Sequence, residues 1–165
     1  MADNYLEKKY EEFQARKNGA GKKKTNSIHK MRRVFVTGGA DGIGKTIVKA
    51  FRMAGNRVAF CDTNEVLGKE TAEKTGTTFY HADIYDKEAL DNCMRHILQE
   101  WGDLDILINN AGTIGYSPIT ESSVEDFERI LSVNLRSTFL TSRLLAIHRQ
   151  SQATPNPYGR IINIC

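Results

Sequence analysis

Short apolar runs rich in β-branched and aromatic residues alternate along the chain with longer segments whose apolar residues recur at helical spacing. Strands separated by helices of this length indicate βαβ units, in which the strands are parallel and helices cover both faces of the sheet. Right-handed crossovers restrict such units to a doubly wound topology. We therefore predict an α/β fold, a three-layer Rossmann-type doubly wound parallel sheet with strand order 3-2-1-4-5. The predicted strands are 34–37, 57–61, 77–81, 104–109 and 160–164, and the predicted helices are 42–54, 65–75, 87–101 and 124–150, the last long enough to contain an interruption near Asn134.

Length and composition narrow the class of protein. A chain of 165 residues fits one domain that can bury a hydrophobic core without disulfides or metal. Its apolar stretches fall far short of the ~20 residues that a membrane helix requires, and its charged start lacks the apolar segment of a secretory signal. Cys61, Cys93 and Cys165 are odd in number and widely spaced, which favours reduced thiols. We expect a cytoplasmic protein with no metal site and with neither membrane nor nucleic acid as a partner.

Residues 1–30 differ in charge from the rest of the chain. They hold eight Lys/Arg against four Asp/Glu, whereas residues 31–165 hold fifteen against sixteen. We predict a basic, partly helical or flexible extension over 1–30, followed by the α/β domain over 31–165. Leu6, Tyr10 and Phe13 could form one helix face that docks on the body or on a second subunit. The lysines at 22–24 could touch an anionic partner, although a solvated linker is the simpler interpretation.

A glycine-rich segment, Thr37-Gly38-Gly39-Ala40-Asp41-Gly42-Ile43-Gly44, follows the first predicted strand and opens the first predicted helix. Glycines let the backbone approach a phosphate closely, while the helix N-terminus offers free N–H groups and the positive end of the helix dipole. A tight strand-to-helix turn needs glycine for steric reasons too, so the cluster alone is a weak indication. Its place between strand and helix predicts a dinucleotide cradle. Gly44-Lys45-Thr46 also raises ATP or GTP hydrolysis as an alternative, which we rank well below the dinucleotide. The cofactor-binding candidates here are Thr37, Gly38, Asp41, Gly42, Ile43 and Gly44.

Asp62 ends the second predicted strand, eighteen residues beyond Gly44. A carboxylate at this position can accept both hydroxyls of the adenosine ribose and repels a 2′-phosphate. A site for that phosphate would want a cation nearby, but Asp41 occupies the glycine loop and Thr63 follows Asp62. The sequence therefore favours NAD over NADP as cofactor. A turn or a cap for the helix at 65–75 is the alternative role of Asp62, and the two roles are compatible.

Four motifs in order make residues 31–165 resemble the short-chain dehydrogenases/reductases. The spacing Thr-Gly, three residues, Gly-x-Gly is similar to the form that this family uses. Asn109-Asn110-Ala111-Gly112 ends the fourth predicted strand, Asp83-Ile84 follows the third, and Val133-Asn134-Leu135 lies in the last helix. The resemblance implies hydride transfer between a nicotinamide cofactor and an alcohol or carbonyl substrate. It also implies homo-oligomers for a full-length member, an expectation that does not extend to this chain.

The resemblance also implies roles for individual residues. It places Asp83 and Ile84 at the adenine, and Asn110, Ala111 and Gly112 beside the cofactor's ribose and nicotinamide. Asn134 matches the asparagine of the family's active site and is our catalytic candidate, in a helix kink that could hold a water. Three alternatives remain. Asp83 could be an ordinary strand-end carboxylate, Asn109 a structural brace and Asn134 an exposed amide.

The family completes its chemistry with a serine after the fifth strand, then a tyrosine and a lysine four residues beyond it. The lysine lowers the pKa of the tyrosine, which exchanges a proton with the substrate, and the serine polarises the reacting group. By the resemblance Cys165 stands one place before that serine, so we expect a chain truncated after the fifth strand and inactive as it stands. A non-catalytic NAD-binding module, paired with a full-length relative, is the alternative.

Overall fold

The computed structural model describes residues 31–154 and 156–164. Strands and helices alternate along them, and one π-helical turn, η1, interrupts the last long helix. This order confirms the predicted α/β class. The strands are β1 (Arg33–Thr37), β2 (Arg57–Asp62), β3 (Thr78–His81), β4 (Ile106–Asn109) and β5 (Arg160–Asn163). The helices are α2 (Gly42–Met53), α3 (Glu65–Thr75), α4 (Lys87–Trp101), α5 (Val124–Leu131), η1 (Ser132–Arg136) and α6 (Ser137–Gln150).

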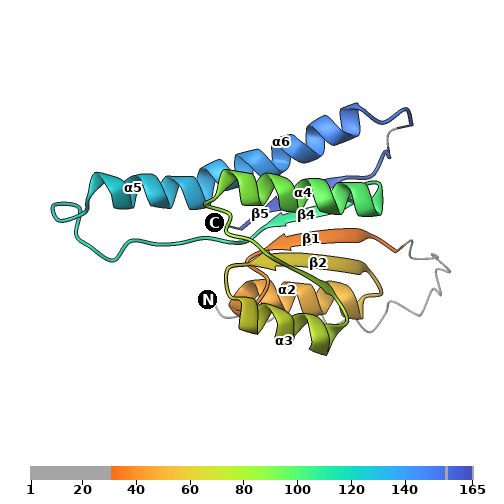
Figure 1. The fold of residues 1–165 in the computed structure, drawn as a ribbon, viewed down its shortest axis with the longest axis horizontal. Helices are drawn as coiled ribbons and strands as arrows, with labels where there is room; N and C mark the ends of the chain where they lie inside the picture. Colours follow the sequence, from red (N-terminus) through yellow and green to blue (C-terminus); the bar gives the residue numbers. More distant parts are fainter. Residues whose placement is uncertain (1–30, 155, 165) are drawn as a thin grey trace, which may run out of the picture. The chain divides into compact units, whose positions relative to one another are not determined.

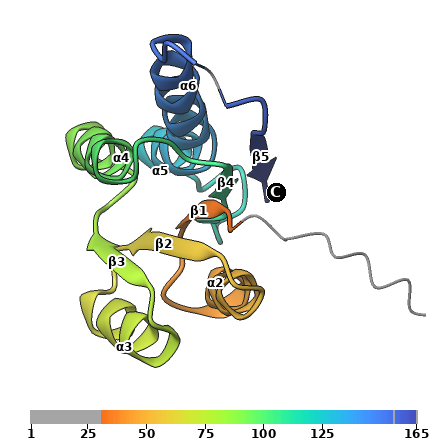
Figure 2. The ribbon, with the colours of Figure 1, turned by 90° about the vertical axis from the view of Figure 1, so that its right-hand side faces the viewer.

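The five strands form one parallel sheet in the order β3-β2-β1-β4-β5, as predicted (Figure 1 and Figure 2). In the central strand, Phe35 lies opposite Ala59 of β2 and Leu107 of β4. Thr37 lies opposite Cys61 at the carboxyl ends of their strands. This register brings the carboxyl ends of β1, β2 and β4 to one edge of the sheet, where the segments that follow them meet.

Two cores form because successive strand residues point to opposite faces of the sheet. Phe35 and Leu107 face α4 and α6, where they pack with Leu145. Val34 and Val36 face the other way and pack with apolar residues of α2 and α3. Figure 2 shows α2 and α3 on one side of the sheet and α4, α5 and α6 on the other. These are the three layers that the alternation predicted.

Local signals set most helix boundaries. The side chain of Asn64 accepts a hydrogen bond from the N–H of Leu67 and so caps α3, and the carboxylate of Asp86 caps α4 in the same way. Gly76 and Gly102 end the two helices with φ of +63° and +72°, a left-handed conformation that glycine adopts without steric cost. The predicted bounds 65–75 and 87–101 agree with the structure.

The predicted helix 124–150 is interrupted where the sequence indicated. α5 leads into η1, a π-helical turn over Ser132–Arg136 that contains Asn134, and α6 follows. Single π-turns inside α-helices occur often at functional sites. This π-turn directs Asn134 toward the loop after β4 and Arg136 toward the loop after β3.

Two predictions concern residues outside the described ones: the helical or flexible extension over 1–30 and the position of Cys165. Within residues 31–154 and 156–164, no helix combines the length and apolar character needed to cross a membrane.

Candidate functional site

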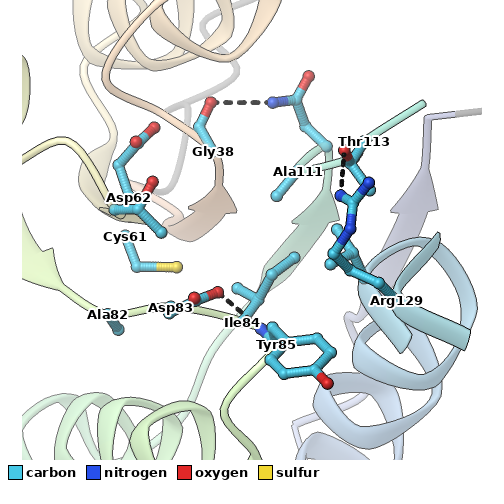
Figure 3. Close-up of a pocket in the computed structure, with 14 residues that line it drawn as sticks. Gly38, Cys61, Asp62, Ala82, Asp83, Ile84, Tyr85, Ala111, Thr113 and Arg129 are labelled. Carbon is cyan, nitrogen blue, oxygen red and sulfur yellow. Dashed lines mark hydrogen bonds between the residues drawn. The ribbon is translucent and has the colours of Figure 1, made fainter. Parts of the chain in front are cut away.

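A pocket of about 590 Å³ lies at the carboxyl ends of β1 to β4 (Figure 3). In the order 3-2-1-4-5 the connections diverge between β1 and β4, and ligands of doubly wound sheets bind at such a switch point. The predicted residues Gly38, Asp62, Asp83, Ile84, Asn110, Ala111 and Gly112 line the pocket. The predicted Thr37, Asp41, Gly42, Ile43, Gly44 and Asn134 lie outside its lining.

The glycine loop tolerates few other residues at Gly38 and Gly44. Gly38 adopts φ +68°, and its N–H donates to the carbonyl of Cys61 over 2.8 Å. Gly44 has no room for a side chain, because a Cβ there would lie 1.8 Å from the carbonyl oxygen of Gly38. Within the described part of the chain, the side chain of the N-cap residue Asp41 makes no capping hydrogen bond to α2. The first N–H groups of that helix therefore remain available to another acceptor.

The segment from Gly39 to Thr46 also has the full spacing of a triphosphate-binding loop, glycine, four residues, then Gly-Lys-Thr. Spacing therefore does not argue against this alternative, but the geometry does. α2 already begins at Gly42, two residues before the Gly-Lys-Thr at which the helix of such a loop begins, so only Ala40 and Asp41 remain to surround a phosphate. The hydroxyl of Thr46 donates to the carbonyl of Gly42 over 3.1 Å instead of facing a metal ion.

Asp62 connects the glycine loop to the turn before α3. One carboxylate oxygen accepts the N–H of Ala40 over 3.0 Å, and the other accepts the N–H of Asn64 over 3.0 Å. The cap of α3 is Asn64 rather than Asp62. Each oxygen of Asp62 keeps a lone pair that can accept a further donor, and the side chain lines the pocket.

Thr37 and Asn110 join the ends of β1 and β4. The hydroxyl oxygen of Thr37 accepts the N–H groups of Asn110 and Ala111, each over 3.1 Å. The side-chain amide of Asn110 donates to the carbonyls of Thr37 and Gly38, both over 3.0 Å. Thr37 thus shapes the pocket indirectly, because it holds the backbone of Asn110 and Ala111. The small Ala111 and Gly112 leave space inside the pocket.

Asn109 is a buried brace. Its amide nitrogen donates to the side-chain oxygen of Asn163 in β5 over 2.9 Å, and its amide oxygen accepts the hydroxyl of Thr141 in α6 over 2.8 Å. It is not among the residues that line the pocket. The geometry supports the structural brace that the sequence analysis offered for Asn109.

Asp83 and Ile84 follow β3 at the side of the pocket (Figure 3). The Asp83 carboxylate accepts the N–H of Tyr85 over 2.8 Å and so shapes the turn that leads to α4. Ile84 is buried and forms part of the core beneath the pocket. The backbone of this turn is therefore held before any ligand arrives.

Asn134 contacts the loop after β4 from the π-turn. Its amide oxygen accepts the N–H of Thr113 and its amide nitrogen donates to the carbonyl of Thr113, both over 2.8 Å. The neighbouring Val133 lines the pocket, whereas Asn134 itself does not. The amide is thus bonded on both sides rather than free, even though its residue is solvent-exposed.

Several pocket residues escaped the sequence analysis. Arg129 is the cation among the described residues that line the pocket; its guanidinium donates to the hydroxyl of Thr113 over 3.1 Å and pairs with Asp126 at 3.3 Å. Helical spacing could have indicated it, since it lies one turn before Val133 on the same face. Cys61, Thr63, Ala82, Tyr85 and Thr113 also line the pocket and carried no motif of their own.

Cys61 does not supply a nucleophile. A hydrogen bond with Cys93 and complete burial raise the pKa of the Cys61 thiol well above its usual range, so the thiol stays protonated near neutral pH. Both cysteines are free thiols in the core. Over the described ranges, no group of three or more His, Cys, Asp or Glu residues is placed to hold a metal ion.

Comparison with known proteins agrees with this geometry. The family model described as short chain dehydrogenase matches residues 32–165. Sorbitol dehydrogenase from Cereibacter sphaeroides is 31% identical over 132 residues, which cover 79% of this chain and 50% of that protein. The chain spans about half the length of the curated relatives it matches.

Solved structures show the same fold. A 3-ketoacyl-(acyl-carrier-protein) reductase from Brucella melitensis, complexed with NADH, matches with a TM-score of 0.67 at 31% identity, over 72% of this chain and 50% of that one. A blue fluorescent protein from a metagenomic library, in complex with NADPH, matches with a TM-score of 0.71 at 27% identity, over 80% and 54%. Both nicotinamide nucleotides therefore occur among proteins similar to this chain.

Proposed function

The chain belongs to the short-chain dehydrogenase family, and from this premise we propose that its pocket binds NAD for hydride transfer between the nicotinamide and an alcohol or carbonyl substrate. The observation that carries the proposal is the arrangement of the glycine loop and the Asp62 carboxylate on one side of a pocket at the switch point of the sheet. The open N–H groups of α2 suit the pyrophosphate. Gly38, Asp41, Gly42, Ile43 and Gly44 would cradle it.

The preference for NAD over NADP rests on charge. Asp62 can accept the two ribose hydroxyls with the lone pairs that its backbone contacts leave free, and it repels a 2′-phosphate. Arg129, the cation among the described lining residues, is tied to Thr113 on the wall opposite Asp62 (Figure 3). A 2′-phosphate beside Asp62 would therefore meet a like charge without a compensating cation from these residues.

The remaining candidate residues would contact other parts of the cofactor or hold the backbone around it. Asp83 and the Ile84 main chain would contact the adenine, and the backbone at Asn110, Ala111 and Gly112 would lie along the nicotinamide ribose. Thr37 would hold that backbone in place. Asn134, through Thr113, would fix the wall of the pocket near the reacting end of the cofactor.

The Asp62→Ala variant tests the cofactor assignment. We expect the ratio of NAD+ to NADP+ affinity to fall about tenfold, equal to ~1.4 kcal/mol, because the variant loses a ribose acceptor and the repulsion of a 2′-phosphate. The lost contact with the N–H of Ala40 should weaken the binding of both nucleotides alike. The Asp91→Ala variant removes a partly buried carboxylate of α4 that pairs with Arg95, and it should alter the affinity for neither nucleotide. Equal losses for both nucleotides in the Asp62 variant would argue against the assignment.

Turnover by the 165-residue chain itself is a separate question. Hydride transfer to a carbonyl needs a proton donor at the carbonyl oxygen, and we assign no described lining residue to that role. We therefore expect no NAD-dependent alcohol oxidation by this chain. Turnover clearly above a control without enzyme would contradict the expectation.

We also propose self-association through the outer face of α5, η1 and α6. Leu131, Leu135 and Phe139 recur there at four-residue spacing and are 41%, 63% and 61% exposed. Glu128 and Arg136 border this face, and a twofold axis would pack the three apolar side chains against those of a second copy. Light scattering should give twice the chain mass of 18.6 kDa, and Leu135→Glu should reduce it to one chain; a monomeric wild type would refute the proposal.

A further inference from the structure

Tyr85 is a large aromatic residue at the edge of the pocket for which the proposed cofactor contacts provide no role. It directly follows Asp83 and Ile84, lines the pocket, and is 48% exposed. In Figure 3 its ring extends from the end of β3 along the margin of the pocket, beyond Ile84 and away from Asp62. A half-exposed ring in this place is available to a ligand.

The backbone of Tyr85 is held on both sides. Its N–H donates to the carboxylate of Asp83 over 2.8 Å, and its carbonyl accepts a hydrogen bond from the Arg136 guanidinium over 2.6 Å. Arg136 belongs to the π-turn, 51 residues away in sequence. The turn that carries the ring is thus fixed by a side chain from a different element, η1.

The ring itself also contacts Arg136. The guanidinium carbon lies 5.4 Å from the centroid of the Tyr85 ring, within the range of a cation–π interaction. One arginine therefore holds both the backbone and the ring of Tyr85. Because the ring is already ordered, a ligand that packs on it loses less conformational entropy than one that must order a free side chain.

We propose that Tyr85 is the stacking wall for the purine base of the nucleotide and that Arg136 is the positioning residue that holds it. The inference rests on the proposed function, since it assumes that an adenine nucleotide occupies the pocket. Asp83 and Ile84 would then address the edge of the base while the adjacent ring of Tyr85 covers its face. The π-turn thereby supports both loops of the pocket, through Asn134 to Thr113 and through Arg136 to Tyr85.

Titration of the full chain with NAD+ tests the stacking role. Stacking of a base on an aromatic side chain is worth ~1–3 kcal/mol, so Tyr85→Ala should raise the Kd about 5- to 150-fold. Tyr85→Leu keeps an apolar side chain without an aromatic face and should give a similar but smaller loss. Tyr85→Phe retains the face and should bind like the wild type. Far-UV circular dichroism checks that each variant is folded.

A double-mutant cycle tests the positioning role. Arg136→Ala should raise the Kd a few-fold in the wild-type background and have no further effect in Tyr85→Ala, because Arg136 acts through the ring. Arg136→Lys, which keeps a cation and a donor, should restore part of the affinity. Additive losses in the cycle would overturn the role of Arg136, since they would show that it acts independently of Tyr85.

Two outcomes separate this inference from the proposed function. If the wild-type chain does not bind NAD+, the proposed function and the inference both fail. If the wild type binds NAD+ and both Tyr85→Ala and Tyr85→Leu bind it with unchanged Kd, the stacking role alone is overturned.

Discussion

At the scale of single residues, the glycine loop contains glycines that are required for different reasons. Gly44 is required by contact, since any Cβ would collide with the carbonyl of Gly38. Gly42 is required only by its backbone, which has φ +55° with open space around it. The sequence shows both as glycine and does not distinguish them.

Gly44→Ala should therefore be far more harmful than Gly42→Ala. The first must push the helix away from the loop, at a cost of about 3 kcal/mol, and should abolish nucleotide binding. The second places alanine in a left-handed conformation at about 1–2 kcal/mol. Urea unfolding followed by circular dichroism measures the loss of stability in each variant. Equal losses would contradict this account of the loop.

At the scale of elements, the π-turn connects the two loops of the pocket. Asn134 holds Thr113 through two hydrogen bonds, and Arg136 holds the carbonyl of Tyr85. A regular α-helix would rotate the two side chains differently relative to each other. The irregular turn is thus part of how the pocket is built.

Asn134→Ala should release the loop after β4. We expect about 1 kcal/mol of lost stability, because the freed groups of Thr113 can reach water, together with several-fold weaker NAD+ binding. Ser142→Ala is the control: among residues 31–154 and 156–164 its hydroxyl bonds only to Thr138 of its own helix, and both quantities should stay unchanged. Wild-type affinity in Asn134→Ala would show that the loop holds its position without the amide.

The same elements show what the sequence could and could not predict. Strand order follows from the alternation of strands and helices and from right-handed crossovers. Helix bounds and the interruption near Asn134 follow from local signals such as caps, glycines and an asparagine inside a helix. The hydrogen bond from Arg136 to Tyr85 could not be predicted, because it depends on how η1 and the loop after β3 are placed relative to each other. The pocket position of Arg129, in contrast, could have been inferred from its helical spacing to Val133.

At the scale of the whole molecule, a buried network stabilises the sheet at the end opposite the pocket. Asp105 accepts hydrogen bonds from the Arg33 backbone and guanidinium and from the amide of Asn156, over 2.7–3.3 Å. Arg33 and Arg149 also contact Asp103. The network links the start of β1, the approach to β4, α6 and the loop before β5.

The network predicts a loss of stability in acid. Burial opposes ionisation of Asp105, but the hydrogen bonds and charge of Arg33, with the amide of Asn156, outweigh it and lower the pKa of this carboxyl. Its contribution is therefore present above the unfolded-state pKa of ~3.9 and is lost as pH falls through the lower folded-state value.

Asp105→Asn should remove this contribution. We expect about 3 kcal/mol of lost stability near pH 7, as when one partner of a buried ion pair is removed, and a weaker dependence of stability on pH below ~5. NAD+ affinity of the folded variant should not change, because the network is remote from the pocket. An unaltered acid profile would contradict the role given to Asp105.

The central claim is that the pocket at the carboxyl ends of β1 to β4 selects NAD through Asp62. Isothermal titration of the wild-type chain with NAD+ and with NADP+ tests it most directly. We predict saturable binding of one NAD+ per chain and at least about tenfold weaker binding of NADP+, equal to ~1.4 kcal/mol. Binding of neither nucleotide, or tighter binding of NADP+, would contradict the claim.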